Sequence, residues 1–246
     1  MKNPPSFPGG VSVSRRAVYD WPADDGAGRA GSGTPHLHTV SSEGYVVVAG
    51  EGTVQTLGQD GYAEHRLFPG KVVWFSPGVV HRLVNDGGLE IVVVMSDAGL
   101  PEAGDAVLTF PQDLLEDPER YEEAARLPDQ SPELTDDPRV AAAARRRRDL
   151  ALAGYAQLRE RVDAEGGAGL AELHAAAGLL VAGRVPEWRA VVRAGAERST
   201  AGTVAALGEL AHGGVGHLSD ATVAARAAHA GPPRYGMCGR LTTWAL

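Results

Sequence analysis

The sequence predicts an α+β protein in which an antiparallel β-barrel or sandwich is followed by an α-helical C-terminal region. Residues 43–95 hold short β-prone runs separated by glycine and proline turns, with no helical period. Residues 139–229 are rich in alanine, and their apolar residues recur three and four positions apart. Residues 231–246 return to β-prone and aromatic residues, which predicts a final strand packed on the barrel.

These patterns divide the chain into four parts. We expect a barrel over residues 1–110 and a connector with short helices over 111–138, where prolines and aspartates mark a linker. A helical bundle is expected over 139–230, and the remaining part, 231–246, is the tail.

Each element is placed by its turn and cap residues. Strands are expected at residues 11–21, 44–49, 53–57, 62–68, 71–76, 80–84, 89–95 and 107–110. Gly50-Glu51-Gly52 and Asp86-Gly87-Gly88 are expected to separate strands. In the helical region we expect a break near Gly202 and an N-cap for the last helix at Ser219-Asp220.

Composition limits the kind of partner. The 246 residues carry a net charge of −8 and a pI near 5.5, which argues against nucleic acid or an anionic membrane surface as partner. With Cys238 as the one cysteine, no internal disulfide forms, and no apolar run suggests a signal peptide or a membrane span. We therefore expect a cytoplasmic protein. Abundant Ala, Gly and Arg with few Lys suggest a GC-rich, bacterial genome.

Four residues in two clusters have the chemistry of a metal site. His36 and His38 lie two apart on an expected strand, so both side chains enter the same interior. Glu43 follows from the next strand, and His81 comes from a distant strand just past the Pro77-Gly78 turn. Imidazoles with one carboxylate suit Fe, Mn, Ni, Zn or Cu better than Ca. The alternative is a barrel that has this pattern but uses its cavity without a metal.

The two clusters resemble the two motifs of the cupin superfamily. His36, His38, Glu43 and Gly50 match the first motif, and Gly70, Pro77, His81 and Asn85 match the second. In this chain Gly78 follows Pro77 directly, a departure that keeps the histidine in register. The resemblance covers roughly residues 11–110 and implies a small antiparallel jelly-roll barrel with one metal ion inside.

Strand parity selects further residues of the interior. If Glu43 points inward, Tyr45 does too, which makes Tyr45 the nearest phenol for donating a proton to a substrate. Its alternative role is that of a core aromatic residue. Asn85 is expected to bind backbone rather than substrate. The loop 22–33 is expected to be a plain connection, with a lid over the cavity as the alternative.

Two classes of function stay open. The first is a metal-dependent enzyme acting on a small oxygen-rich metabolite, with dioxygenase chemistry ahead of isomerase or lyase chemistry, Tyr45 and Glu43 as catalytic residues, and Glu43 also as a metal ligand. The second is a module that binds or senses a small, sugar-like molecule. A homodimer through the barrel is one expected assembly. The run Arg145–Arg148 is expected to lie on a solvated or ion-paired helix face rather than to bind nucleic acid.

Overall fold

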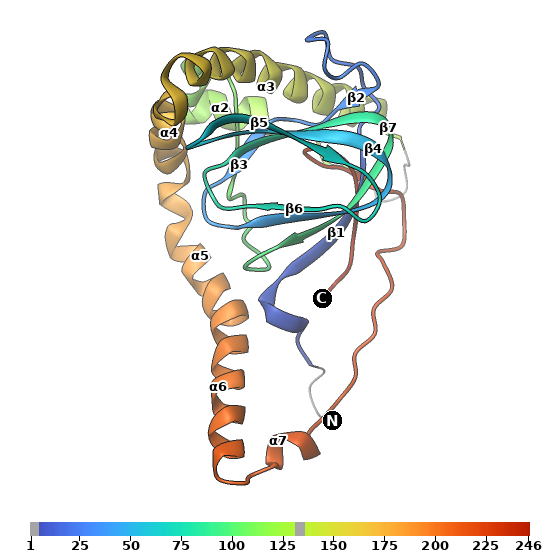
Figure 1. Ribbon diagram of the computed structural model, residues 1–246, viewed down its shortest axis with the longest axis vertical. Coiled ribbons are helices and arrows are strands. Elements are labelled where there is room, and N and C mark those ends of the chain that lie inside the picture. Colours follow the sequence, from blue (N-terminus) through green and yellow to red (C-terminus); the bar gives the residue numbers. More distant parts are fainter. Residues whose placement is uncertain (1–4, 131–135) are drawn as a thin grey trace.

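The computed structural model describes residues 5–130 and 136–246. The strands are β1 (Ser12–Val18), β2 (Gly31–Ser32), β3 (His36–His38), β4 (Glu43–Gly58), β5 (Gly61–Leu67), β6 (Val72–Phe75), β7 (Val80–Met95), β8 (Ala106–Leu108), β9 (Arg234–Tyr235) and β10 (Gly239–Thr243). The helices are α1 (Gln112–Leu115), α2 (Pro118–Ala125), α3 (Pro138–Glu165), α4 (Ala171–Val181), α5 (Val185–Val192), α6 (Arg198–Ala211) and α7 (Gly216–Ser219). The predicted α+β class, barrel first and helices after, is confirmed (Figure 1).

Two long antiparallel strands, β4 and β7, form the frame of the barrel. The first half of β4 pairs with β6 and its second half with β5, while β7 pairs with β4 throughout and also with β1, β2 and β3. The expected strand ends at residues 50–52 and 86–88 are wrong, because both strands continue through these positions. β4 instead shifts register there, and a Cβ on Gly50 would lie 2.1 Å from the carbonyl oxygen of Gly88. Glycine therefore permits a bend in which two backbones touch.

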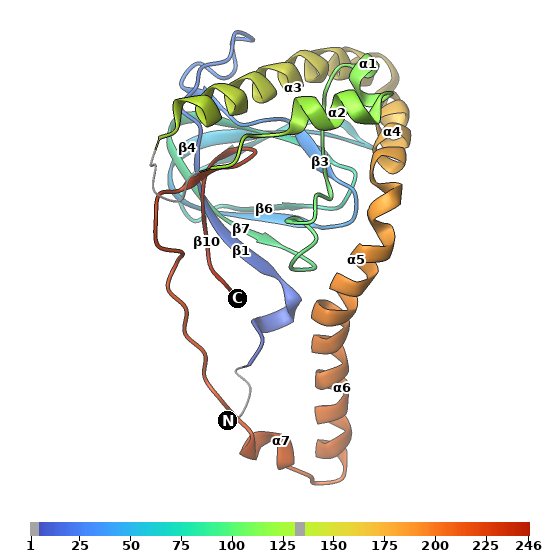
Figure 2. The same cartoon turned by 180° about the vertical axis from the view of Figure 1, so that it is seen from behind.

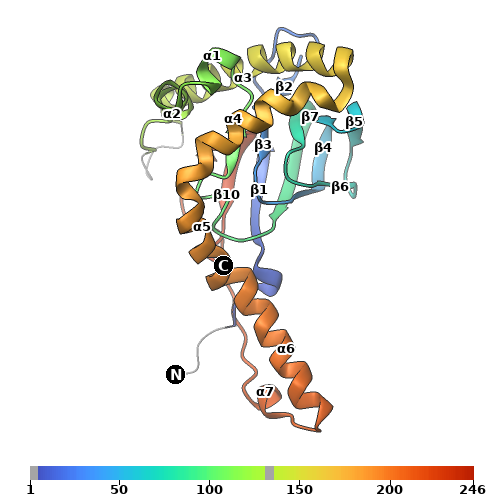
Figure 3. The same ribbon diagram turned by 90° about the vertical axis from the view of Figure 1, so that its left-hand side faces the viewer.

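The barrel and the helices share a core. Tyr45, Leu83 and Ile91 fill the barrel interior and are fully buried. On the other side of the sheet, Leu57 and Val80 pack in a second cluster together with apolar residues of α3 and α4. The helices therefore cover one outer face of the barrel, as Figure 3 shows.

The helices follow one another in a single bent run rather than forming the expected bundle (Figures 1 and 2). The helix α6 contains no buried residue and points away from the barrel. It continues through Gly202, so the expected break there is wrong. The expected N-cap at Ser219-Asp220 is also wrong, since Ser219 ends α7 and residues 221–229 form no helix. The exposed alanines of this last segment have no surface to pack against, so propensity alone does not make a helix.

The arginine run of α3 is only half solvated. Arg145 and Arg146 are exposed, whereas Arg148 is 2% exposed and Arg147 is 9% exposed. Arg148 donates to the carbonyl oxygens of Trp21 at 2.7 Å and of Pro22 at 3.2 Å. The expected face was solvated or ion-paired. Arg148 is ion-paired with Asp149 at 2.6 Å, but solvation is wrong for both Arg147 and Arg148, which are buried and bind backbone carbonyl groups.

The C-terminal tail returns to the barrel as predicted. β10 pairs antiparallel with β1 from Ser14↔Thr243 to Val18↔Gly239, and β9 pairs with β10. Tyr235 is 9% exposed and packs with Tyr19 and Val140. The tail thus covers the edge of β1, which would otherwise offer unpaired backbone groups.

One feature of the helices bears on the expectation that the chain has no membrane span. By length and composition alone, the helical run Pro138–Ala211 is long and apolar enough to cross a membrane, a test that core helices of soluble proteins also pass. The sequence analysis expects no apolar run of that length. The run passes the test because it is rich in alanine, which is mildly apolar.

On the outer face of the barrel, Trp74 is 75% exposed and Val72 is 49% exposed. The homodimer through the barrel stays a prediction.

Deleting residues 235–246 should lower the thermal stability or cause aggregation, because the edge of β1 and the Tyr235 pocket become exposed. A domain of this size loses about 2–4 °C in melting temperature per kcal/mol, so we expect a shift of several degrees in a calorimetric scan. Deleting only the exposed Ala245 and Leu246 is the control and should change little. A melting temperature equal to that of the full chain after the longer deletion would contradict the clamp.

Arg148→Ala should destabilise the protein by about 2–4 kcal/mol, since it removes a buried guanidinium that donates to three backbone carbonyl groups and lies over the Trp21 ring. Arg146→Ala, two residues away and exposed, should stay within about 0.5 kcal/mol of the parent chain. Urea unfolding followed by circular dichroism measures both. Equal stability of the two variants would show that the buried guanidinium contributes nothing.

Candidate metal centre

The short strand β3 carries the first two histidines of the cluster. His36 pairs with His81 of β7 and with Leu108 of β8, which fixes the strand from both sides. His36 and His38 point into the barrel, whereas Leu37 between them packs in the core shared with the helices. The alternation of the strand therefore delivers both imidazoles to the same interior.

The turn before β7 sets the position of His81. Gly78 has a φ of 86°, a conformation that favours glycine, and its N–H donates to the carbonyl oxygen of His38 at 2.9 Å. The carbonyl oxygen of Gly78 accepts from Nε2 of His174 on α4 at 2.9 Å. The turn is thereby tied to β3 on one side and to the helices on the other.

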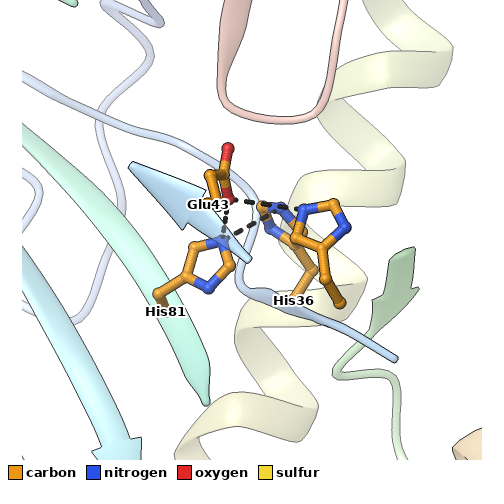
Figure 4. A group of neighbouring side chains, drawn as sticks. His36, Glu43 and His81 are labelled. Atoms are coloured by element: carbon orange, nitrogen blue, oxygen red, sulfur yellow. Dashed lines mark hydrogen bonds and ion pairs between the residues drawn. The ribbon is translucent and has the colours of Figure 1, made fainter. Parts of the chain in front are cut away.

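The four predicted ligands converge in the interior (Figure 4). One donor atom from each of His36, His38, Glu43 and His81 can be chosen so that all lie within 4.8 Å of one another. Nε2 of His81 lies 3.1 Å from Nε2 of His36 and 3.0 Å from Oε2 of Glu43, and Nε2 of His38 lies 3.3 Å from the same oxygen. All four residues are at most 6% exposed.

Backbone oxygens fix the protons of two of these histidines. Nδ1 of His36 lies 2.8 Å from the carbonyl oxygen of Thr34, and Nδ1 of His81 lies 3.1 Å from that of Val79. A carbonyl oxygen only accepts, so each Nδ1 carries the hydrogen and donates it. In the neutral imidazoles both Nε2 lone pairs then face the interior and each other.

Asp105 orients the third histidine and was missed in the sequence. Its Oδ1 accepts from Nδ1 of His38 at 2.6 Å, and its Oδ2 accepts from the N–H of Ser41 at 2.8 Å. Asp105 is fully buried just before β8, which pairs with β3. The sequence gives Asp105 no motif, because it lies in a Gly- and Pro-containing connector. The one available signal was that this acidic residue stands just before the strand expected at residues 107–110.

The donor set fits one transition-metal ion. An ion about 2.1 Å from two ligands at right angles holds them about 3.0 Å apart, close to the separations found here. Facing lone pairs and a carboxylate oxygen repel one another unless a cation or a proton lies between them. The structure thus supports a cluster that can bind a metal ion, with His36, His38, Glu43 and His81 as its ligands.

Without a metal ion, His38 holds a second proton that offsets the charge of Glu43, and a metal that binds Nε2 of His38 displaces this proton. Burial and the neighbouring His81 and His38 hold the pKa of His36 well below its usual value. Burial also acts to lower the pKa of His38, but hydrogen bonds to Asp105 and Glu43 outweigh it and raise that pKa to about 9. Burial opposes ionisation of Glu43, yet its contacts with His38 and His81 hold its pKa well below the usual range. Glu43 is therefore an anion among imidazoles.

Tyr45 points into the same interior, as parity predicted. It is fully buried, and its hydroxyl makes no hydrogen bond of normal geometry to the described residues. Burial first, and then the charge of Glu43, raise the pKa of Tyr45 well above its usual value, so the phenol stays neutral. A buried hydroxyl without a partner is costly unless water or a ligand supplies one.

Asn85 binds backbone, as expected. Its Nδ2 donates to the carbonyl oxygen of Val18 at 3.1 Å, and its Oδ1 accepts from the N–H of Gly87 at 3.0 Å and of Leu89 at 3.1 Å. It therefore holds the bend of β7 against β1 rather than contacting the metal cluster.

The loop 22–33 lies over Arg82 rather than over the cluster. Arg82 is 1% exposed and donates to the side chains of Asp25 and Ser32, both in this loop. Arg82 follows His81 on the strand, so it points to the opposite face of the sheet. The loop therefore serves as a connection, the first of the two expected roles.

The strand frame and the buried His/His/Glu/His cluster define a metal-binding type of β-barrel. Residues 27–96 match the family model described as "Cupin domain", and this segment contains all four cluster residues. This part of the chain is therefore a cupin domain. The matched segment is less than half of the chain, and the helices lie outside it. No curated protein matches the chain.

Solved structures with a similar barrel include three from bacteria. An uncharacterised conserved protein with a double-stranded β-helix domain from Klebsiella pneumoniae is 22% identical over 35% of this chain and 64% of its own, with a TM-score of 0.26. QdtA, a sugar 3,4-ketoisomerase from Thermoanaerobacterium thermosaccharolyticum, is 14% identical over 39% of this chain and 64% of its own, with a TM-score of 0.32. The capsular polysaccharide assembling protein CapF of Staphylococcus aureus is 22% identical over 39% of this chain and 25% of its own, with a TM-score of 0.28. Each match thus spans less than two thirds of the solved protein.

Asp105→Asn should weaken metal binding by about 10–100-fold, because the charge that fixes the His38 tautomer is lost while the shape is kept. Competition with a chromogenic chelator measures the affinity. Asp113→Asn, an exposed carboxylate on α1 that pairs with Arg120, is the matched control and should bind metal like the parent chain. Unchanged affinity in Asp105→Asn would show that the buried carboxylate does not tune the site.

Proposed function

We propose that this chain is a metal-dependent enzyme acting on a small, oxygen-rich metabolite such as a hydroxy-ketone. One observation carries the proposal: three Nε2 atoms and a carboxylate oxygen converge in a buried interior beside the Tyr45 phenol, whose hydroxyl makes no hydrogen bond of normal geometry within residues 5–130 and 136–246 and lies under the charge of Glu43. A site that served only to stabilise the fold would not need an unpartnered hydroxyl next to it.

The chain's residues divide between holding the ion and moving protons. A bound divalent ion supplies Lewis acidity, polarising a substrate carbonyl. Four protein ligands would hold the ion: His36, His38, Glu43 and His81. In a five- or six-coordinate metal ion they leave one or two coordination positions open for substrate. The neutral Tyr45 hydroxyl can donate to a substrate oxygen.

Glu43 supplies a base and Tyr45 supplies a proton donor in the same buried interior. Oε2 of Glu43 faces the histidines, while its other oxygen points away from them (Figure 4). In the proposed step a proton passes from the carbon beside the substrate carbonyl to Glu43, and Tyr45 donates a hydrogen bond to the carbonyl oxygen. The product is an enediolate, whose oxygen the Tyr45 hydrogen bond stabilises, and burial protects it from bulk water.

Two fates of the enediolate separate the reaction classes. Oxidation by O2 gives dioxygenase-like chemistry, the class that the sequence analysis put first. Return of the proton to the neighbouring carbon gives isomerisation, and the paired acid and base favour this second class. A sugar-like binding module is the outcome if no proton is moved at all.

Metal content tests the ligand set directly. Protein purified without added metal and then loaded should hold about one ion per chain by elemental analysis. His81→Ala should lose most of it, because the three remaining ligands no longer close around the ion. His212→Ala, an exposed histidine of the C-terminal region, is the control and should retain the full amount. Full metal content in His81→Ala would overturn the site.

Solvent deuterium exchange tests the chemistry independently of the final product. The chain loaded with Fe(II), Mn(II), Ni(II) or Zn(II) should catalyse exchange of the proton beside the carbonyl in a panel of hydroxy-ketones, followed by NMR, while an oxygen electrode records O2 uptake. Tyr45→Phe should lower the rate by about 100-fold or more with unchanged metal content. The absence of both exchange and O2 uptake with all four metals would favour the binding module.

A further inference from the structure

The turn between β9 and β10, residues 236–238, lies close to the metal cluster of His36, His38, Glu43 and His81. Cys238 is 1% exposed and packs in the barrel core with Tyr45. A Cβ on Gly33 would lie 3.0 Å from Cys238, so the turn touches the backbone just before β3. Figure 4 shows a loop in the C-terminal colour beside Glu43, whose charge acts on the Cys238 thiol.

Every carbonyl group of this turn is bound by another part of the chain. Gly236 O accepts from the Tyr19 hydroxyl at 2.9 Å and from Nη2 of Arg147 at 2.8 Å. Cys238 O accepts from the N–H of Tyr19 at 3.2 Å. Hydrogen bonds from the barrel and from α3 therefore fix the position of this turn.

The third carbonyl connects the turn to the metal cluster. Met237 O accepts from Oγ1 of Thr34 at 2.6 Å and from the N–H of Thr34 at 3.2 Å. The carbonyl oxygen of the same Thr34 accepts the Nδ1 hydrogen of His36 at 2.8 Å. Thr34 thus donates two hydrogen bonds to the tail. The same residue fixes the tautomer and orientation of the proposed ligand His36.

We propose that the C-terminal hairpin is a positioning part of the metal centre, acting from Met237 through Thr34 on His36. This inference rests on the metal site proposed above. Ligand histidines depend on the acceptor at their second nitrogen, and loss of that support lowers metal affinity by about 10–100-fold. The hairpin, which follows the whole helical region in the sequence, therefore helps to set how long the metal stays bound.

A purely structural hairpin predicts a different result. If the hairpin only covers the edge of β1, weakening its contact with Thr34 lowers the stability of the fold but leaves the metal as tightly held as before. The two accounts differ in metal kinetics and in the electronic spectrum of the ion, not in stability.

Thr34→Val in the full chain is the decisive variant, since it removes the hydroxyl bond to Met237 and keeps the buried shape. Zn(II) release into excess EDTA should be roughly 10-fold faster than in the parent chain. In the Co(II)-loaded variant the visible d–d bands should shift, because the carbonyl group that orients His36 is then held to the tail by one hydrogen bond instead of two. Thr34→Ser retains the hydroxyl and should restore both properties.

Tyr155→Phe is the matched control. Tyr155 is 5% exposed, and its hydroxyl donates to Oε1 of Gln55 at 3.5 Å, so a buried hydroxyl bond is lost away from the hairpin and from the backbone beside His36. Its zinc release should equal that of the parent chain. If Thr34→Val does not fold, Tyr19→Phe, which frees Gly236 O from one donor, should give a smaller acceleration of release.

Each outcome assigns a failure to one proposal. A parent chain that binds no metal overturns the proposed function. A parent chain that binds metal, with release from Thr34→Val or Tyr19→Phe as slow as its own and an unchanged Co(II) spectrum, overturns the positioning role of the hairpin alone. Equal acceleration in Tyr155→Phe would likewise reduce the effect to general loosening.

Discussion

The arrangement of the barrel interior depends on where three protons are held. Each imidazole of the cluster gives its Nδ1 hydrogen to an oxygen outside the chamber, the carbonyl of Thr34, the carbonyl of Val79 or the carboxylate of Asp105. A neutral imidazole has one donor and one acceptor nitrogen, so fixing the first directs the lone pair of the second inward. The cation-binding character of the chamber thus follows from hydrogen bonds made outside it.

These acceptors come from segments that would not otherwise meet. Thr34 lies between β2 and β3, Val79 lies in the turn before β7, and Asp105 precedes β8. Backbone pairing of β3 with both β7 and β8 brings them to one end of the barrel. The helices reinforce the same end, because His174 of α4 binds the turn at Gly78.

Local sequence patterns were enough to predict the convergence of His36, His38, Glu43 and His81, the antiparallel barrel and the returning tail. His36 and His38 follow strand parity, and the Pro77-Gly78 turn places His81, so short-range geometry determines them. Asp105 could not be found in the same way, since its partner His38 lies far off in the sequence and meets it only through the β3–β8 pairing.

Other expectations failed where tertiary packing overrides a local signal. The glycines around Gly50 read as strand ends, yet two backbones approach there within a continuous ladder. Arg147 and Arg148 read as a charged surface, yet they lie buried against backbone carbonyl groups. Ser219-Asp220 had the residues of a cap but no apolar face after it to support a helix.

The path of the chain between α6 and β9 has a further consequence. The helical arm leaves the barrel at α5, and the exposed stretch 221–229 returns to a strand that pairs with β1 (Figure 2). A protease that cuts this stretch would separate the polypeptide into two fragments without breaking any β1–β10 hydrogen bond. The short fragment would stay docked as a non-covalent subunit, so the molecule is arranged as a natural candidate for fragment complementation.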